Sequence, residues 1–343
     1  MKICYFGHPA HEWSGSSKFF EEILSSLGSM VIYRPSSLNV DDVIRVGIES
    51  DFDLYVFFQF DFLAYPFIAA GKRVLVVPMV DGSASYGSEH WQKLRGSRFV
   101  SFSKNLDEFL KIGGHDSLHT QFWPEPKEES SAENMSAYYW PRGNHEYVST
   151  QKIVSLFKNY PEIKIKVRAS DSPESELDYS RVHSDNIEII RINSRIEHLE
   201  EIQKSAIFIA PRPSEGIGHS FIEPLTFGRC VVARKYPTMS EYISNRDNGL
   251  LFNAKTKPIN QGIDWIQLGK NAYSRAIKGH ESYLQSLEGL SNFILTTKAS
   301  TRRVRVSEVH ELLDISSSIL KGLYFPKGKL YTLQNWIRVK NFR

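Results

Sequence analysis

Two glutamates, Glu215 and Glu223, stand with seven residues between them in the stretch PSEGIGHSFIEPLTFG, residues 213–228. A carboxylate is a good acceptor for a pair of neighbouring sugar hydroxyls. Between the two glutamates, Gly216 and Gly218 allow a turn in which the backbone approaches a ligand closely, and a helix start beyond them would attract an anion. The spacing therefore predicts a phosphate or diphosphate cradle between two hydroxyl acceptors, which is the chemistry of a nucleotide sugar.

The same stretch also has a purely structural interpretation. Pro224 lacks a backbone N–H and is comfortable only in the first turn of a helix, which predicts a helix start near Phe221. Ser220 would then be the N-cap, and Glu223 would reach back to it in a capping box. This interpretation accounts for Ser220 and Glu223, but it leaves Glu215 and the paired glycines unexplained.

The elements around this stretch predict an α/β fold. Short apolar runs alternate with helix-like segments, as in parallel sheets covered on both faces. The predicted strands are residues 2–6, 30–33, 54–60, 73–79, 98–103, 137–140, 163–169, 187–192, 207–211 and 230–234, and the predicted helices include 16–28, 40–50, 104–114, 147–161 and 195–206.

A polar run divides this pattern into two similar halves. We expect an N-terminal Rossmann-like domain over 1–123, a surface linker over 124–137 and a second Rossmann-like domain over 138–300. In such sheets ligands bind at the carboxyl ends of the strands, which would set both halves beside one cleft. The remaining residues, 301–343, are predicted to form a helical basic tail. Its end, Lys321–Arg343, mixes basic and aromatic residues, so the tail either packs back on the first domain or contacts an anionic membrane surface.

Composition narrows the class of protein. The 343 residues are 41% hydrophobic and 24% charged, as in a folded soluble protein. The 42 basic and 39 acidic residues nearly cancel, so charge does not predict nucleic-acid binding. Cys4 and Cys230 lie in apolar runs and are expected to be buried free thiols. Without a run of about 20 apolar residues or a signal peptide, we expect a cytoplasmic protein.

Residues 213–253 resemble the donor-site segment of retaining glycosyltransferases of the two-Rossmann-domain (GT-B) type, the family-4-like group called glycosyl transferases group 1. The resemblance rests on the two spaced glutamates, the VVA strand, a further glutamate at Glu241 and the NGLL run. Upstream, residues 186–216 resemble the stretch by which such enzymes hold the base, and Asn193 in it is a candidate donor ligand. Elsewhere the resemblance is architectural only.

The resemblance implies roles for individual residues. Glu215 would meet the hydroxyls of the transferred sugar, and Glu223 would bind the ribose. The diphosphate or the sugar of the donor would be met by the turn and helix start, namely Gly216, Gly218, His219 and Ser220.

Further site residues are implied less directly. Arg142 would stabilise the leaving phosphate, although no lysine stands at the distance where the family carries a second cation. Gly15 and Ser16 would correspond to the glycine-rich loop of the first domain. Asp81 stands near the position where the family often has a catalytic-site histidine, which leaves the acceptor side open.

The implied activity is retaining transfer of a sugar from a nucleotide-diphosphate sugar to a saccharide or lipid-linked saccharide, in polysaccharide biosynthesis and without a metal or other cofactor. Two alternatives stay open: a nucleotide-sugar epimerase or hydrolase of the same fold, and an inactive nucleotide-sugar-binding protein. The acidic residues of 51–53 and the pair His8 and His11 have spacings compatible with a metal, but a helix-to-strand turn and a loop explain them better.

Overall fold

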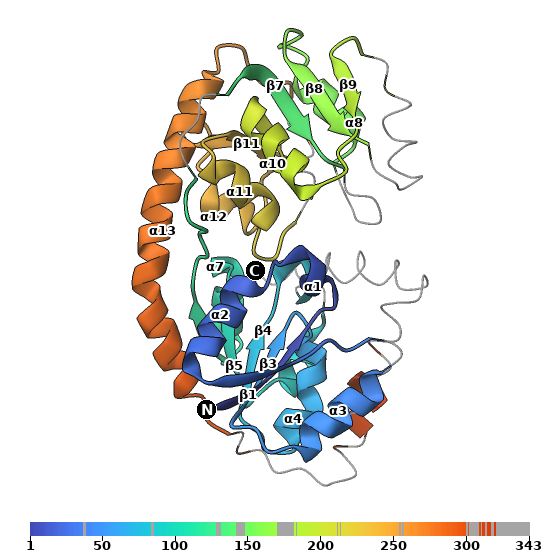
Figure 1. Ribbon diagram of the computed structural model, residues 1–343, viewed down its shortest axis with the longest axis vertical. Coiled ribbons are helices and arrows are strands. Elements are labelled where there is room, and N and C mark those ends of the chain that lie inside the picture. Colours follow the sequence, from blue (N-terminus) through green and yellow to red (C-terminus); the bar gives the residue numbers. More distant parts are fainter. Residues whose placement is uncertain are drawn as a thin grey trace. The chain divides into compact units, whose positions relative to one another are not determined.

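The computed structural model describes residues 1–36, 39–83, 86–127, 132–141, 148–169, 182, 184–210, 212, 214–253, 255, 257–299, 301, 309, 311–312, 314–316 and 319. The chain forms two compact units. Unit 1 consists of Met1–Thr120 together with Gln285–Arg343, and unit 2 consists of Gln121–Leu284 (Figure 1).

Unit 1 is built on a six-stranded sheet in which every pairing is parallel, in the order β2-β1-β3-β4-β5-β6. Its strands are β1 (Lys2–Gly7), β2 (Ser29–Tyr33), β3 (Leu54–Phe58), β4 (Val74–Val77), β5 (Arg98–Ser101) and β6 (Asp116–His119). Its helices are α1 (Ala10–Ser14), α2 (Lys18–Leu27), α3 (Val40–Glu49), the 3-10 helix η1 (Asp61–Ala64), α4 (Tyr65–Ala69), α5 (Val80–Ser83), α6 (Ser88–Lys93) and α7 (Lys104–Ile112).

The central strands of unit 1 are apolar on both faces, because helices cover both. All residues of β3 and β4 are buried, and Phe57 stacks on Phe6 of β1 with ring centroids 4.8 Å apart. This continuous burial explains why these strands read as unbroken apolar runs in the sequence.

Unit 2 repeats the architecture with a second parallel six-stranded sheet, ordered β12-β11-β10-β7-β8-β9. Its strands are β7 (Asn134–Tyr139), β8 (Lys164–Arg168), β9 (Ile187–Ile190), β10 (Ser205–Ile209), β11 (Cys230–Arg234) and β12 (Gly249–Phe252). Its helices are α8 (Thr150–Leu156), α10 (Arg195–Lys204), α11 (His219–Thr226), α12 (Met239–Tyr242) and the first part of α13 (Trp265–Leu295).

The predicted fold class, an α/β chain with two Rossmann-like sheets, is confirmed by these two parallel sheets. One boundary was wrong. The polar run of 124–137 was expected to be a linker throughout, but β7 begins at Asn134 inside it. The first two residues of β7 are exposed, and for this reason their composition does not reveal the strand.

The long helix α13 belongs to both units, because the division falls between Leu284 and Gln285 within it (Figure 1). The predicted end of the second domain, residue 300, therefore differs from the boundary between the units. Beyond α13, the described part of the tail packs on unit 1: Leu312 is buried in its core, and Ser316 Oγ donates a hydrogen bond to the carbonyl oxygen of Phe62 at 2.8 Å.

Cys4 and Cys230 are buried and free, as expected, and burial raises the pKa of both thiols. Among the described residues, none of the helices combines the length and the apolar character that crossing a membrane requires. The basic segment Lys321–Arg343, on which the membrane hypothesis rests, lies outside the described residues.

Candidate functional site

Helix α11 begins earlier than expected. Its first residue is His219, and its N-cap is Gly218, whose φ of 93° lies in the left-handed region that glycine adopts readily. The amides of Phe221 and Ile222 both donate to the Gly218 carbonyl oxygen, at 3.0 and 2.9 Å. The predicted start near Phe221 with Ser220 as N-cap was therefore wrong, and Pro224 lies inside the helix rather than in its first turn.

The hydroxyl of Ser220 instead binds Glu215. Ser220 Oγ donates to Glu215 Oε1 at 2.6 Å, and Arg212 Nη1 lies 3.4 Å from Glu215 Oε2. Only 6% of Glu215 is exposed. The predicted capping box between Ser220 and Glu223 is absent from α11, because no side chain caps this helix. Glu215, which had no structural explanation in the sequence, is thus a buried carboxylate held by two neighbours.

Thr238 fixes the backbone at Glu215. Its hydroxyl donates to the Glu215 carbonyl oxygen at 2.8 Å and lies 3.4 Å from that of Gly216. Thr238 is fully buried, caps α12 in a capping box with Glu241, and has a φ of 71°. A β-branched residue in this region is strained by about 1–3 kcal/mol, so surrounding contacts must hold it there. The sequence contained no signal for this residue.

Glu223 lies on the second turn of α11 and forms an ion pair with Arg195, the first residue of α10. About 22% of the Glu223 side chain and 61% of the Arg195 side chain are exposed. Neither Arg195 nor Arg212 was predicted from the sequence as a site residue, although Arg212 stands only three residues before Glu215.

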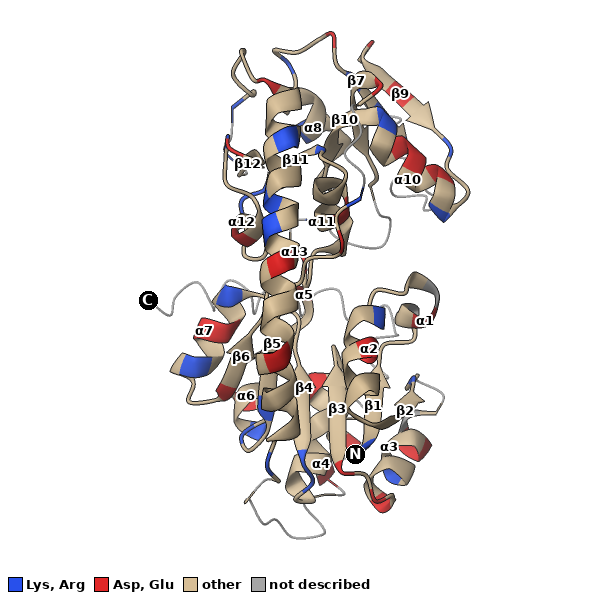
Figure 2. Cartoon of the chain, turned by 60° about the vertical axis from the view of Figure 1, so that its left-hand side comes forward, with Lys and Arg blue, Asp and Glu red and all other residues tan. Residues whose placement is uncertain are grey.

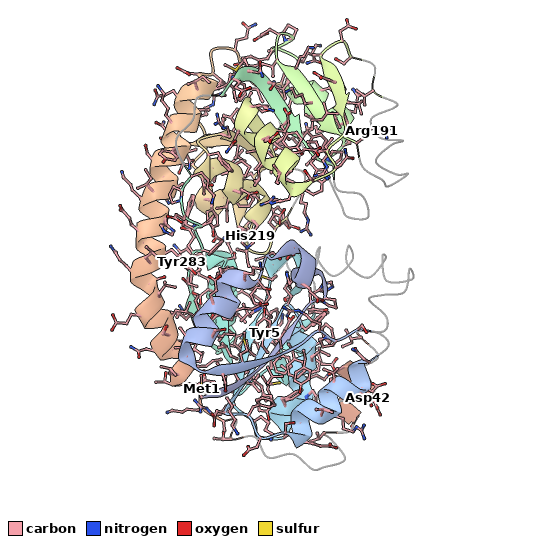
Figure 3. The ribbon with its side chains drawn as sticks, viewed as in Figure 1. Met1, Tyr5, Asp42, Arg191, His219 and Tyr283 are labelled. Atoms are coloured by element: carbon pink, nitrogen blue, oxygen red, sulfur yellow. The ribbon has the colours of Figure 1, made fainter. Side chains whose placement is uncertain are left out.

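The first turn of α11 has the geometry of an anion site. The dipole of the helix points its positive end toward its leading N–H groups, those of His219 and Ser220, and so favours an anion there. The ring of His219 lies 5.0 Å from that of Phe122, and Phe122 in turn meets Tyr283 edge-on at 5.2 Å. His219 and Tyr283 are labelled in Figure 3. His219 is therefore fixed against the body of unit 2 at the start of this helix.

Asn193 stands directly before α10. Its backbone N–H donates to Glu197 Oε2 at 3.0 Å, while Ser194 Oγ accepts from the Glu197 N–H at 3.1 Å. This reciprocal capping fixes the turn between β9 and α10, where Asn193 was predicted to contact the donor.

In unit 1, the predicted loop residues Gly15 and Ser16 belong to a polar network at the carboxyl end of the sheet. Ser16 Oγ lies 2.6 Å from His11 Nδ1, and His11 Nε2 lies 2.7 Å from Gln59 Oε1. Gly15 ends α1 with a φ of 65°, and Gln59, just beyond β3, has the same φ. The sequence analysis named Gly15 and Ser16 but missed the part that Gln59 plays in holding His11.

Asp81 is the second residue of α5, immediately beyond β4. Its charge acts on His11 and favours the protonated imidazole, but burial is the largest effect and lowers the pKa of His11. Burial likewise lowers the pKa of His8 to about 4. At neutral pH both imidazoles are therefore uncharged. The position at which the family often has a histidine is thus occupied by Asp81. The histidine whose pKa Asp81 affects is His11.

Arg142, expected to stabilise the leaving phosphate, lies outside the described residues. Within the part of the chain that the structure describes, no group of three or more His, Cys, Asp or Glu side chains gathers closely enough to hold a metal ion.

The segment that carries this candidate site matches a known family model. Residues 169–282 match the family model described as glycosyl transferases group 1. The match includes Glu215, Glu223 and both arginines that contact them. No curated protein sequence matches the chain.

Solved structures share the fold over nearly the whole chain. The HepE protein of Anabaena, in complex with UDP and glucose, is 13% identical, with a TM-score of 0.57 over 84% of this chain and 100% of that chain. Sucrose-phosphate synthase of Thermosynechococcus elongatus is 11% identical, with a TM-score of 0.63 over 86% and 99%. The apo form of the lipopolysaccharide outer core galactosyltransferase WaaB is 11% identical, with a TM-score of 0.57 over 86% and 99%. At these identities the likeness establishes the fold alone.

Proposed function

We propose that the chain is a glycosyltransferase that moves a sugar from a nucleotide-diphosphate sugar to a saccharide or lipid-linked saccharide, with retention at the anomeric carbon. The observation that carries the proposal is Glu215 at the turn leading into α11, whose buried carboxylate accepts from Ser220 and whose backbone carbonyl oxygen accepts from Thr238. The family match over 169–282 supports it, as does the fold shared with proteins whose names include a galactosyltransferase and a sucrose-phosphate synthase.

Each donor group meets a complementary partner in this arrangement. The N–H groups of His219 and Ser220 donate hydrogen bonds to the diphosphate, and this stabilisation increases as the leaving phosphate gains charge. Glu215 accepts hydrogen bonds from the hydroxyls of the transferred sugar, and Glu223 accepts them from the ribose. Fixed dipoles of this kind lower the barrier because they need no reorganisation during the reaction.

The first test is incubation with a panel of nucleotide-diphosphate sugars, with and without saccharide acceptors. The proposal expects slow nucleotide release without acceptor and faster release with the right one, and NMR of the product should show the donor's anomeric configuration. Isomerised donor would indicate an epimerase, rapid release without transfer a hydrolase, and binding without turnover a binding protein.

The remaining parts of the proposal concern metal and location. We expect transfer to proceed unchanged after chelation with EDTA, and a loss that Mn²⁺ or Mg²⁺ restores would contradict this. We also propose that the protein works in the cytoplasm at the inner face of a membrane, which Lys321–Arg343 contacts. If removing these residues leaves co-sedimentation with anionic vesicles unchanged, the membrane contact is wrong.

A further inference from the structure

The ion pair between Arg195 and Glu223 has no evident role in holding the fold. A surface ion pair of this exposure contributes about 0–1 kcal/mol to stability. Arg195 also occupies the first position of α10, where the helix dipole disfavours a cation. Ser194 and Glu197 already satisfy that helix start, so Arg195 is not needed as a cap.

Helix α10 nevertheless holds Arg195 in a fixed place. The Tyr138 hydroxyl lies 2.8 Å from His198 Nδ1, and Lys166 Nζ donates to Glu201 Oε1 at 2.7 Å, so two contacts tie α10 to β7 and β8. Two other charges of α10 follow the dipole, with Glu197 in the first turn and Lys204 in the last (Figure 2). Arg195, by contrast, stands where the dipole does not favour a cation.

The guanidinium is also close to the anion site. Glu223 lies three residues beyond Ser220, a rise of about 4.5 Å along the axis of α11. The carboxylate that Arg195 binds is thus carried by the turn of α11 that follows the proposed diphosphate site.

This placement matches the chemistry of a nucleotide. In a nucleoside diphosphate the ribose hydroxyls and the first phosphate are carried by the same sugar ring, so a carboxylate beside a guanidinium complements both groups. Guanidinium binds phosphate oxygens in a bidentate manner, and it also offsets the repulsion between Glu223 and the diphosphate.

We propose that Arg195 is a donor-binding residue, which contacts the ribose-proximal phosphate while Glu223 accepts the ribose hydroxyls. The inference rests on the proposed function, because it assigns a further contact to the same nucleotide. In the free protein the Arg195 guanidinium and the Glu223 carboxylate pair with each other. When the nucleotide binds, the guanidinium contacts its phosphate and the carboxylate accepts from its ribose hydroxyls.

The test is calorimetric titration of the full chain with the nucleoside 5′-diphosphates of adenine, guanine, uracil and thymine, and with the corresponding nucleosides. For the nucleotide that binds, Arg195→Gln should weaken diphosphate binding about tenfold or more, the loss of a hydrogen bond between charged groups, and change nucleoside binding by less than about twofold. Arg195→Lys should lie between, since lysine keeps the charge without the fork.

Lys204→Gln is the matched control, because it removes a surface ion pair with Glu200 at the other end of α10 and should leave both affinities unchanged. A second background separates direct contact from positioning. In Glu223→Gln protein, Arg195→Gln should still weaken diphosphate binding.

Four results would overturn the inference. Equal weakening of nucleoside and diphosphate, or no effect in the Glu223→Gln background, would mean that Arg195 only positions Glu223. If Arg195→Gln binds the diphosphate as the parent does, Arg195 forms only a surface ion pair with Glu223. The proposed function would not be affected by that result. If the parent binds none of the four diphosphates, the inference and the proposed donor site both fail.

Discussion

Replacing Glu215 with glutamine removes one negative charge from the candidate site while keeping its shape. The amide oxygen can still accept from Ser220 Oγ, which now lies 2.6 Å from the carboxylate. Folding should therefore survive. The contacts that change are those to the proposed sugar hydroxyls and to Arg212.

The expected loss of activity follows from those contacts. A hydrogen bond to a charged group contributes about 1.5–3 kcal/mol, against about 0.5–1.5 kcal/mol between neutral groups. Two hydroxyls that exchange a charged for a neutral acceptor lose together about 2–3 kcal/mol. Since about 1.36 kcal/mol corresponds to a factor of ten in rate, kcat/KM should fall roughly 30- to 150-fold.

The loss of stability should be small. The contact between Arg212 and Glu215 is long, at 3.4 Å, so we expect a loss of about 1 kcal/mol and a Tm lower by about 2–4 °C. Glu201→Gln is a matched control. Glu201 also accepts from a serine hydroxyl, that of Ser205 at 3.1 Å, and pairs with a cation, Lys166 at 2.7 Å. It should shift Tm by a similar amount without changing turnover, because the amide oxygen can still accept from Lys166 and so keeps α10 in place.

The assay is initial-rate transfer from the donor identified by the panel, at several donor concentrations, with Tm measured on the same preparations. Turnover by Glu215→Gln within about threefold of the parent would refute the assignment of Glu215 to the sugar. A parallel loss in Glu201→Gln would show that instability, rather than the lost charge, lowers the rate.

Three further predictions concern stability. Gly218→Ala should lower the free energy of unfolding by about 2–4 kcal/mol, because the left-handed backbone disfavours alanine and the new Cβ would come within 2.4 Å of the Phe221 ring. A denaturant midpoint equal to the parent's would contradict this prediction. Gly279→Ala should also lower the free energy of unfolding, by about 1–2 kcal/mol in urea titration. Its Cβ would lie 2.4 Å from the buried Trp123 indole, and this clash outweighs the better helix propensity of alanine. A net gain in the free energy of unfolding would refute the packing argument. Burial lowers the pKa of His8 from 6.5 to about 4. Between these pH values the unfolded chain binds more protons than the folded chain, so stability is lost as pH falls from about 6.5 to 4. His8→Gln should make Tm depend less steeply on pH over that window, and an unchanged slope would contradict this.

The strands were predictable because burial on both faces of a parallel sheet leaves a continuous apolar run, as in β3 and β11. Helix α13 was not predicted, because no element was assigned between residue 253 and the helical tail expected from residue 301. Its glycines weaken a helical pattern, yet packing requires two of them, Gly269 and Gly279. A Cβ on Gly269 would lie 2.3 Å from the Gly228 carbonyl oxygen, and no local pattern discloses a contact of this kind.

The contacts of the candidate site were not predictable from the sequence. The paired glutamates and glycines lie within the segment that matches the family model. The role of Ser220 was not predictable, because the left-handed Gly218 turns its hydroxyl toward Glu215 instead of the helix end. The arginine on Glu223 comes from 28 residues upstream, which is beyond any spacing rule.

The division of the chain also bears on how it is made on the ribosome. Unit 2 is one uninterrupted stretch, whereas unit 1 needs residues from both ends of the chain. Its sheet is complete in sequence at His119, but Leu312 of its core and the hydrogen bond from Ser316 to Phe62 arrive almost two hundred residues later. At about 5–20 residues per second, the nascent sheet waits roughly 10–40 s for them. During this interval the surface that Leu312 covers is open to chaperones, and the second unit to be started is the first to be finished.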